Sequence, residues 1–170
     1  QAVLDDPRSS EAWGQLGVCF DAHDMADEAV AAYRVAADLD PDDFRWPYFI
    51  GSTIGLGDQR AALEMLQTAL RLRVDYAPLH VRLGLGHQKL GETEESDRHF
   101  SRALELDESL IRAHLGLGVN ALGAGDAGRA HAHFQRAVEL GPGQVLPLRH
   151  LSASLRALGN VDEAVRVAEH

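Results

Sequence analysis

The most constraining feature of this 170-residue sequence is a pattern that recurs about every 34 residues. A first short phrase appears as "WGQLG" (13–17), "HVRLG" (80–84) and "HLGLG" (114–118). A longer phrase follows each of them and reads "DEAVAAYRVAADLDP" (27–41), "EESDRHFSRALELDE" (94–108) and "GRAHAHFQRAVELGP" (128–142). A fixed period of this length is typical of solenoid proteins, in which each repeat is one supersecondary unit that packs on its neighbours.

Within each unit the apolar residues occur at helical spacing in two runs that a turn separates. In the fourth unit Leu115, Val119 and Leu122 mark the first run. Gly125 then interrupts the pattern, and Phe134 belongs to the second run. Apolar residues three and four positions apart lie on one face of a helix. The spacing therefore predicts an all-α chain built from pairs of helices.

Small residues recur at fixed places in both helices of the units, with large ones beside them. Glycine in a helix interior costs about 1 kcal/mol relative to alanine, so its recurrence indicates that two helices approach closely there. The small residues are Gly17, Gly51, Gly84 and Gly118 in the first helix and Ala29, Ala62 and Ala130 in the second; the large ones are Tyr33, Phe100 and Phe134.

These units resemble the tetratricopeptide repeat, whose pattern is Trp-x2-Leu-Gly-x2-Tyr, then Ala-x3-Phe, then a closing proline. The first unit matches it nearly completely, with Trp13, Leu16, Gly17, Phe20, Ala29, Tyr33, Ala36 and Pro41. Among the departures, His80 and His114 stand where the family often has tryptophan, Ser96 replaces the small alanine and Ser152 the glycine. The resemblance implies a right-handed α-solenoid of stacked antiparallel helix pairs, the TPR superhelix.

The period divides residues 1–170 into a single array of repeats. Because a repeat array needs terminal units with a polar outer face and neither end supplies one, we expect some self-association through the end surfaces. The predicted boundaries are 1–9 for the tail of a truncated repeat, 10–43, 44–76, 77–110 and 111–144 for repeats, and 145–170 for a second truncated repeat.

The second repeat, which begins "FRWPYFIGSTIGLGD" (44–58), is one residue short. The alignment places Gly51 at the position of close helix approach, so we expect the shortening to fall in the turn near Gly57. Pro47 then lies in the first helical turn, where a missing N–H is tolerated. Trp46 and Phe49 are predicted to be core residues. A phosphate-binding loop is not expected, because no strand precedes the glycines and no Gly-Lys-Ser/Thr follows them.

Composition excludes several classes of partner and site. A net charge of −10 argues against nucleic acid, because phosphate binding requires a basic surface. No apolar run approaches the length of a membrane span, so no membrane insertion is expected. Cys19 is the only cysteine, which excludes an internal disulfide and a site of several thiolates. We expect Cys19 to be buried beside Gly17.

The family resemblance implies that the first helix of each repeat lines a concave groove. Carried over by position, the charged groove residues are six basic ones and two acidic ones, Glu11 and Asp21. Arginine donates paired hydrogen bonds that suit carboxylates, so we expect a protein-binding scaffold for an extended or helical peptide that is acidic or ends in a carboxylate. The predicted groove residues are Arg45, Tyr48, Arg82, Lys89, Arg112, Arg149 and Arg156.

Three alternatives stay open. The arginines could instead pair with carboxylates of neighbouring repeats on a solvated face, where ion pairs contribute little. The array could present substrates to a catalytic domain of a larger enzyme, or it could be a self-association module.

Catalytic and metal-binding signatures are not found in the sequence. Nothing resembles a nucleophile elbow or a zinc-protease helix, and no histidine pair has His-x3-His spacing with a third ligand. We therefore expect no enzyme, no cofactor and no specific metal site. His80 and His114 are expected to fill the tryptophan place, whereas His99, His131 and His133 are expected to be exposed to solvent.

Overall fold

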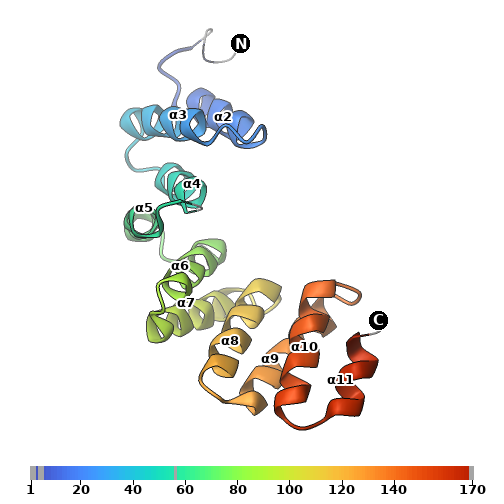
Figure 1. Ribbon diagram of the computed structural model, residues 1–170. Helices are drawn as coiled ribbons and strands as arrows, with labels where there is room; N and C mark the ends of the chain where they lie inside the picture. Colours follow the sequence, from blue (N-terminus) through green and yellow to red (C-terminus); the bar gives the residue numbers. More distant parts are fainter. Residues whose placement is uncertain (1–2, 4–5, 56, 169–170) are drawn as a thin grey trace. The chain divides into compact units, whose positions relative to one another are not determined.

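The computed structural model describes residues 3, 6–55 and 57–168, and every regular element that it bounds in this part of the chain is an α-helix (Figure 1). The predicted all-α fold is confirmed. The chain divides into two compact units, residues 1–86 and 87–170. The helices are α2 (Ser10–Asp21), α3 (Ala26–Leu39), α4 (Arg45–Ile54), α5 (Gln59–Leu72), α6 (Ala77–Lys89), α7 (Thr93–Leu106), α8 (Ile111–Gly123), α9 (Ala127–Leu140), α10 (Val145–Ala157) and α11 (Val161–Ala168).

In the first unit each helix packs against the next one along the chain: α2 against α3, α3 against α4 and α4 against α5. The core at these contacts combines large and small side chains. Tyr33 of α3 and Trp46 of α4 are 1% and 2% exposed, and Ala29 and Ala36 of α3 are fully buried beside them. The predicted assignment of Trp46 to the core is confirmed, and Phe49 packs against the same cluster.

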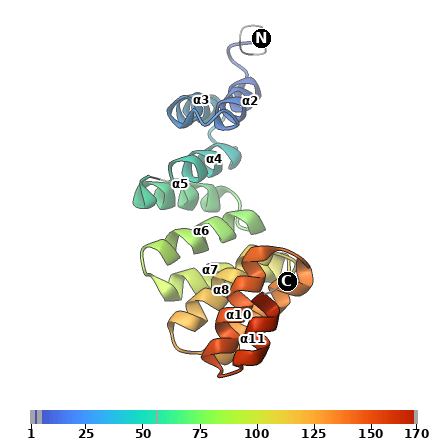
Figure 2. The same ribbon diagram turned by 45° about the vertical axis from the view of Figure 1, so that its right-hand side comes forward.

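In the second unit α7 packs against α8, α8 against α9, α9 against α10 and α10 against α11. Figure 1 shows α8 to α11, from yellow to red, side by side, and Figure 2 shows the same part of the chain from a second direction. Phe134 of α9 is fully buried at the centre of the core, where Leu115 of α8 and Leu151 and Leu155 of α10 join it. The helices α8 and α10 also contact each other directly.

The glycines of the first helices lie where a side chain of the partner helix leaves no room. A methyl group on Gly17 would overlap the Tyr33 ring, and one on Gly118 would overlap the Phe134 ring. At Gly51 the same methyl would lie 2.8 Å from Leu66 Cγ. Leu66 follows Gly51 by 15 residues and Tyr33 follows Gly17 by 16, which agrees with a second repeat that keeps its packing glycine and is one residue shorter after it.

The turn between the two helices of a repeat shows where that residue is lost. In four repeats the turn contains one residue with a left-handed backbone: Asp24 (φ 58°), Gly91 (75°), Gly125 (82°) and Gly159 (83°). In the second repeat, no turn residue that the structure describes has a positive φ. Helix α4 is only 10 residues long, with Pro47 at its third position, where the missing N–H is tolerated.

Candidate functional site

The predicted groove residues all lie on the first helices of the pairs and divide between the two units. Arg45 and Tyr48 of α4 and Arg82 of α6 belong to the first unit. Lys89 at the end of α6, Arg112 of α8, and Arg149 and Arg156 of α10 belong to the second.

Arg45 is already paired with carboxylates. Its Nη2 donates to Glu11 Oε2 at 2.8 Å and to Asp43 Oδ2 at 2.6 Å, and the guanidinium lies over the Trp46 ring. Burial alone would raise the pKa of Asp43, but the hydrogen bonds from Arg45 hold that pKa below its ordinary value. Glu11 belongs to the preceding repeat. Arg45 is therefore one of the arginines that pair with a carboxylate of a neighbouring repeat, which was the first of the alternatives from the sequence.

Tyr48 belongs to a half-buried aromatic cluster at the start of α6. Its ring meets the edge of Tyr76 with centroids 5.5 Å apart, and Tyr76 in turn meets Phe44 at 5.1 Å. The guanidinium of Arg73 lies over both Phe44 and Tyr76. Burial and the neighbouring Tyr48 raise the pKa of Tyr76. Each ring of this cluster keeps part of its surface in contact with solvent.

Asp21, the second acidic residue predicted for the groove, joins three helices of the first unit. Its carboxylate accepts a hydrogen bond from the Tyr33 hydroxyl at 2.7 Å and from Thr53 Oγ1 at 3.1 Å. Burial, followed by the hydrogen bond to Asp21, raises the pKa of Tyr33. This carboxylate therefore has a structural role between α2, α3 and α4.

Four of the predicted cations differ from Arg45. Arg82, Arg112, Arg149 and Arg156 are exposed, and none forms an ion pair with any residue that the structure describes. Lys89 is exposed as well.

The contacting helices α8 and α10 carry three of these arginines and contain no aspartate or glutamate. Arg149 and Arg156 are seven residues apart and so lie on one face of α10, and the same spacing relates Arg112 to Val119 on α8. Val119 is 37% exposed and Leu146 of α10 is 53% exposed. Exposed apolar side chains therefore accompany the arginines on both helices. We call Arg112, Val119, Leu146, Arg149 and Arg156 the α8–α10 face.

The acidic side chains of the second unit gather instead at the starts of second helices. Glu94 and Glu95 lie in the first turn of α7, and Asp162 and Glu163 in the first turn of α11. Carboxylates are favourable there because they face the positive end of the helix dipole.

A buried amide network in the second unit was not predicted from the sequence. Asn120 of α8 accepts from Gln88 Nε2 at 2.7 Å, and its own amide donates to Ser96 Oγ at 2.9 Å and to Asp97 Oδ1 at 2.7 Å. Arg129 donates to the other oxygen of Asp97 at 3.3 Å. The available signal was a single amide within the apolar run "LGLGVNALG". Because Asn120 is 8% exposed and its amide groups are paired, it holds helices together.

Two expectations about exposure are wrong. Cys19 is exposed rather than buried, because two helical steps from the buried Gly17 turn its side chain by about 200°. His99, His131 and His133 are half-buried rather than exposed. His99 stacks on His87, with ring centroids 5.4 Å apart. On α9, His131 Nδ1 lies 3.4 Å from Ser154 Oγ of α10, and His133 contacts α8.

The two histidines predicted at the tryptophan place do fill it. His80 is 6% exposed, and its Nε2 lies 3.0 Å from the Val74 carbonyl oxygen. His114 is half-buried, and its Nε2 lies 3.3 Å from the Glu108 carbonyl oxygen.

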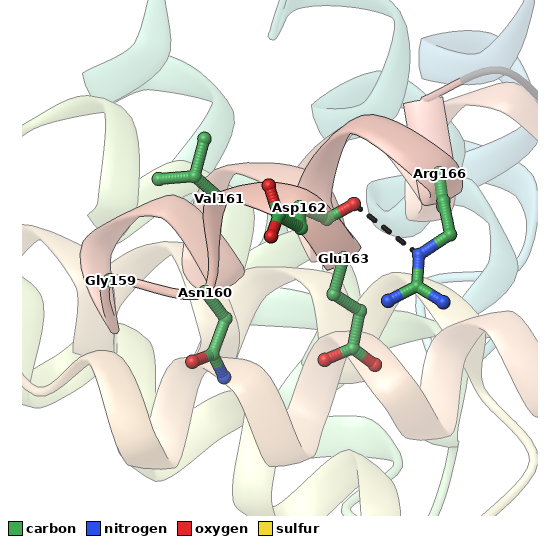
Figure 3. Close-up of a pocket in the computed structure, with 6 residues that line it drawn as sticks. All are labelled: Gly159, Asn160, Val161, Asp162, Glu163 and Arg166. Atoms are coloured by element: carbon green, nitrogen blue, oxygen red, sulfur yellow. Dashed lines mark hydrogen bonds between the residues drawn. The ribbon is translucent and has the colours of Figure 1, made fainter.

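Two surface depressions lie at the same place in their repeats. Figure 3 shows the depression at the start of α11, lined by Gly159, Asn160, Val161, Asp162, Glu163 and Arg166. Arg166 Nε donates to the Asp162 carbonyl oxygen at 3.4 Å. A second depression follows Gly91 at the start of α7 and is lined by residues 91–95. Both are formed by a turn glycine and the acidic helix start that follows it.

Within the described residues, no three or more His, Cys, Asp or Glu side chains gather as metal ligands do. Nor does any helix described by the structure combine the length and apolar character that a membrane span requires.

This chain is similar in sequence to parts of two larger proteins. It is 33% identical over 104 residues to DnaJ homolog subfamily C member 7 of Mus musculus and 26% identical over 109 residues to BBSome complex member BBS4 of Xenopus tropicalis. These matches cover 61% and 64% of this chain but only 21% of each relative. The chain thus spans about a fifth of the length of the curated relatives that it matches.

Solved structures share the fold at low identity. The MamA protein superposes with a TM-score of 0.81 at 20% identity, covering 94% of this chain and 88% of that one. YrrB, described as a TPR protein with an unusual peptide-binding site, gives 0.77 at 20% identity, with 98% and 86% covered. The Cut9–Hcn1 hetero-tetramer of the APC/C gives 0.86 at 21% identity, with 97% and 33% covered.

A family model for the tetratricopeptide repeat matches residues 1–44, 81–145 and 115–169, which is more than half of the chain. The repeat period, the packing glycines and the paired helices agree with that match. The chain belongs to the tetratricopeptide repeat family.

Proposed function

We propose that this chain is a non-enzymatic scaffold whose α8–α10 face receives an acidic segment of a partner protein. The tetratricopeptide fold is that of a protein–protein interaction scaffold. The observation that carries the finer proposal is the set of three exposed arginines, Arg112, Arg149 and Arg156, on two contacting helices that contain no carboxylate.

The charge distribution supports an acidic partner. A chain with a net charge of −10 has ten more carboxylates than cationic side chains, and yet these arginines have no acidic neighbour within ion-pair distance among the described residues. A guanidinium can donate two parallel hydrogen bonds to one carboxylate. A peptide that carries several carboxylates, or one carboxylate at its C-terminus, offers the matching groups.

The exposed apolar residues on the same face define the second property of the partner. Val119 and Leu146 offer apolar contact beside the arginines. Single exposed ion pairs contribute only about 0.2–1 kcal/mol each, so the apolar contacts would supply part of the affinity. We therefore propose that the segment combines acidic residues with aliphatic ones.

The first unit contributes less to this proposal. Arg82 and Tyr48 are proposed contacts, together with Lys89 of the second unit. Arg45 already holds Glu11 and Asp43, so an acidic ligand at Arg45 would have to displace Glu11. Self-association through the end surfaces and substrate presentation to a catalytic domain remain predictions from the sequence.

The test uses charge reversal on the full chain with a matched control. Arg112→Glu/Arg149→Glu removes two arginines of the α8–α10 face. Arg102→Glu/Arg136→Glu changes the net charge equally, on second helices where each arginine pairs with a glutamate three residues later. Binding is measured by fluorescence anisotropy with a labelled acidic-aliphatic peptide, its amidated form and a basic peptide.

We expect the wild-type chain and the control variant to bind the acidic peptide, and the face variant to lose this binding while its helical circular dichroism is unchanged. The affinity should fall as salt is added, because exposed charges are screened. Equal binding of all three proteins, or equal binding of the acidic and basic peptides, would remove the α8–α10 face from consideration.

A further inference from the structure

We propose that His114 of α8 and His133 of α9 bind a divalent transition-metal ion of the Zn²⁺ class through their two Nδ1 atoms. Such a site was not predicted from the sequence, because the two histidines are separated by a turn and lack the spacing of a helical metal motif. This site is separate from the α8–α10 face and does not depend on the proposed function.

The separation of the two nitrogens fits one shared ion. His114 Nδ1 and His133 Nδ1 are 3.2 Å apart, and the rings are tilted by 43° with centroids 5.5 Å apart. Zinc binds histidine nitrogen at about 2.0–2.1 Å with tetrahedral geometry, which places two nitrogen ligands about 3.3 Å from each other. The separation of the two nitrogens is therefore that of two ligands of one ion.

The tautomer of His114 directs a lone pair at this position. Its Nε2 lies 3.3 Å from the Glu108 carbonyl oxygen, which can only accept a hydrogen bond. Nε2 of His114 therefore carries the proton, and Nδ1 is free to donate its electron pair. A metal-bound histidine usually donates its second ring N–H in this way, which fixes the ring and its tautomer.

His133 completes the pair by moving its own proton between ring nitrogens. Without an ion, His133 Nδ1–H donates to His114 Nδ1 and accounts for the short contact. When the ion binds, the proton of His133 moves to Nε2 and both Nδ1 lone pairs become ligands. No proton is gained or lost overall.

The surroundings keep both rings neutral, as metal binding requires. Burial lowers the pKa of His114 and of His133, whereas the positive charges of Arg136 near His114 and of Arg129 near His133 oppose a bound cation. Asp97 acts on His133 in the opposite sense, and its carboxylate also accepts hydrogen bonds from Asn120 and Arg129. Because the described residues bring no third acidic, cysteine or histidine ligand to this pair, water would occupy the remaining coordination positions.

His150 provides a matched control in the same unit. It is also half-buried, but it stacks on Phe134 with ring centroids 5.0 Å apart. Burial and Arg149 lower the pKa of His150 as well. A substitution of His150 therefore removes a half-buried imidazole and leaves the His114–His133 pair intact.

The experiment titrates the full chain, without a histidine tag, with ZnCl₂ in a calorimeter. We expect one ion per chain, with affinity reduced by more than about tenfold in His114→Gln and in His133→Gln, and unchanged in His150→Gln. Nitrogen-15 NMR of the wild-type imidazoles should show the Nδ1 signals of His114 and His133 shifting with added zinc.

Two results would overturn the proposal. One is no saturable zinc uptake by the wild-type chain. The other is uptake that survives both the His114 and His133 substitutions or falls equally with the His150 substitution. If a variant loses its helical circular dichroism, the wild-type NMR titration decides, because unshifted Nδ1 signals of His114 and His133 at zinc saturation exclude the site.

Discussion

Two glycines of α8 should respond to the same substitution with opposite signs. Gly118 faces the Phe134 ring, and a methyl group there would lie 2.7 Å from Cδ1 and 2.9 Å from Cζ of that ring. Gly123, five residues later at the end of the helix, has no heavy atom within 4 Å of the same methyl position. The pair therefore separates helix propensity from packing within one element.

The magnitudes follow from the surroundings of each glycine. Phe134 is fully buried and has no open space to move into, so the overlap costs about 1–3 kcal/mol. Alanine returns at most about 1 kcal/mol of helix propensity. We expect Gly118→Ala to lower the free energy of unfolding by about 1–2 kcal/mol. Gly123→Ala should raise it by about 0.5 kcal/mol, because alanine restricts the unfolded chain.

The assay is urea unfolding followed by far-ultraviolet circular dichroism. A second substitution, Phe134→Leu, removes ring atoms that the new methyl would meet. The loss from Gly118→Ala should therefore be smaller in the Phe134→Leu background than in the wild type. Equal midpoints for Gly118→Ala and Gly123→Ala would refute close packing at Gly118, and full additivity with Phe134→Leu would refute Phe134 as the cause.

Two further predictions follow from the second unit's histidines and from Cys19. Burial lowers the pKa of His114, His133 and His150 below the ordinary value of 6.5, so the unfolded chain binds protons more readily. Their contribution to stability is therefore complete above pH 6.5 and is lost as the pH falls towards the lowered pKa values. The urea midpoint should be lower at about pH 5 than at about pH 7.5, and His150→Phe should reduce the difference; coincident midpoints would contradict this expectation. Cys19 is exposed, so a thiol reagent should modify it in the folded chain at a rate close to that in urea, whereas strong protection in the folded chain would indicate burial.

The helices and their close contacts could be predicted because the repeat fixes them. The 34-residue period places Gly118 one repeat after Gly84 and Phe134 one repeat after Phe100, and helix packing makes each small residue face a large one. The same comparison located the missing residue of the second repeat, since only one alignment kept a glycine at the tight position.

The ion-pair partners of the arginines were predicted less well than the helices. Arg45 pairs with Glu11 because the two occupy the same place in successive repeats, and such places lie next to each other in a stack of helices. Arg112 has Leu146 at its own place one repeat later, which agrees with its lack of an acidic partner. A comparison across repeats, place by place, would have separated these two arginines.

The half-buried histidines required knowledge of the helices that pack against them, which are α6 for His99, α8 for His133 and α10 for His131. Whether a residue on the outer side of α9 meets solvent depends on what α10 places against it, and the sequence pattern of α9 alone does not contain that information. His131 lies close to Ser154 of α10, which is a single polar residue with no periodic signal. The prediction that Cys19 is buried was wrong for a simpler reason. A residue that is close to Gly17 along the chain does not have to lie on the same face of the helix.

The left-handed residue found in four of the inter-helix turns suggests how such chains tolerate changes in length. In the second repeat the missing residue is absorbed before Asp58, which still caps α5 with hydrogen bonds to two backbone amides, and Gly51 still meets Leu66. Deletions and insertions during evolution can therefore accumulate at these bends, whereas one residue gained or lost inside a helix would rotate its buried side out of place. A reporter sequence or crosslinking tag would be best tolerated at the same bends.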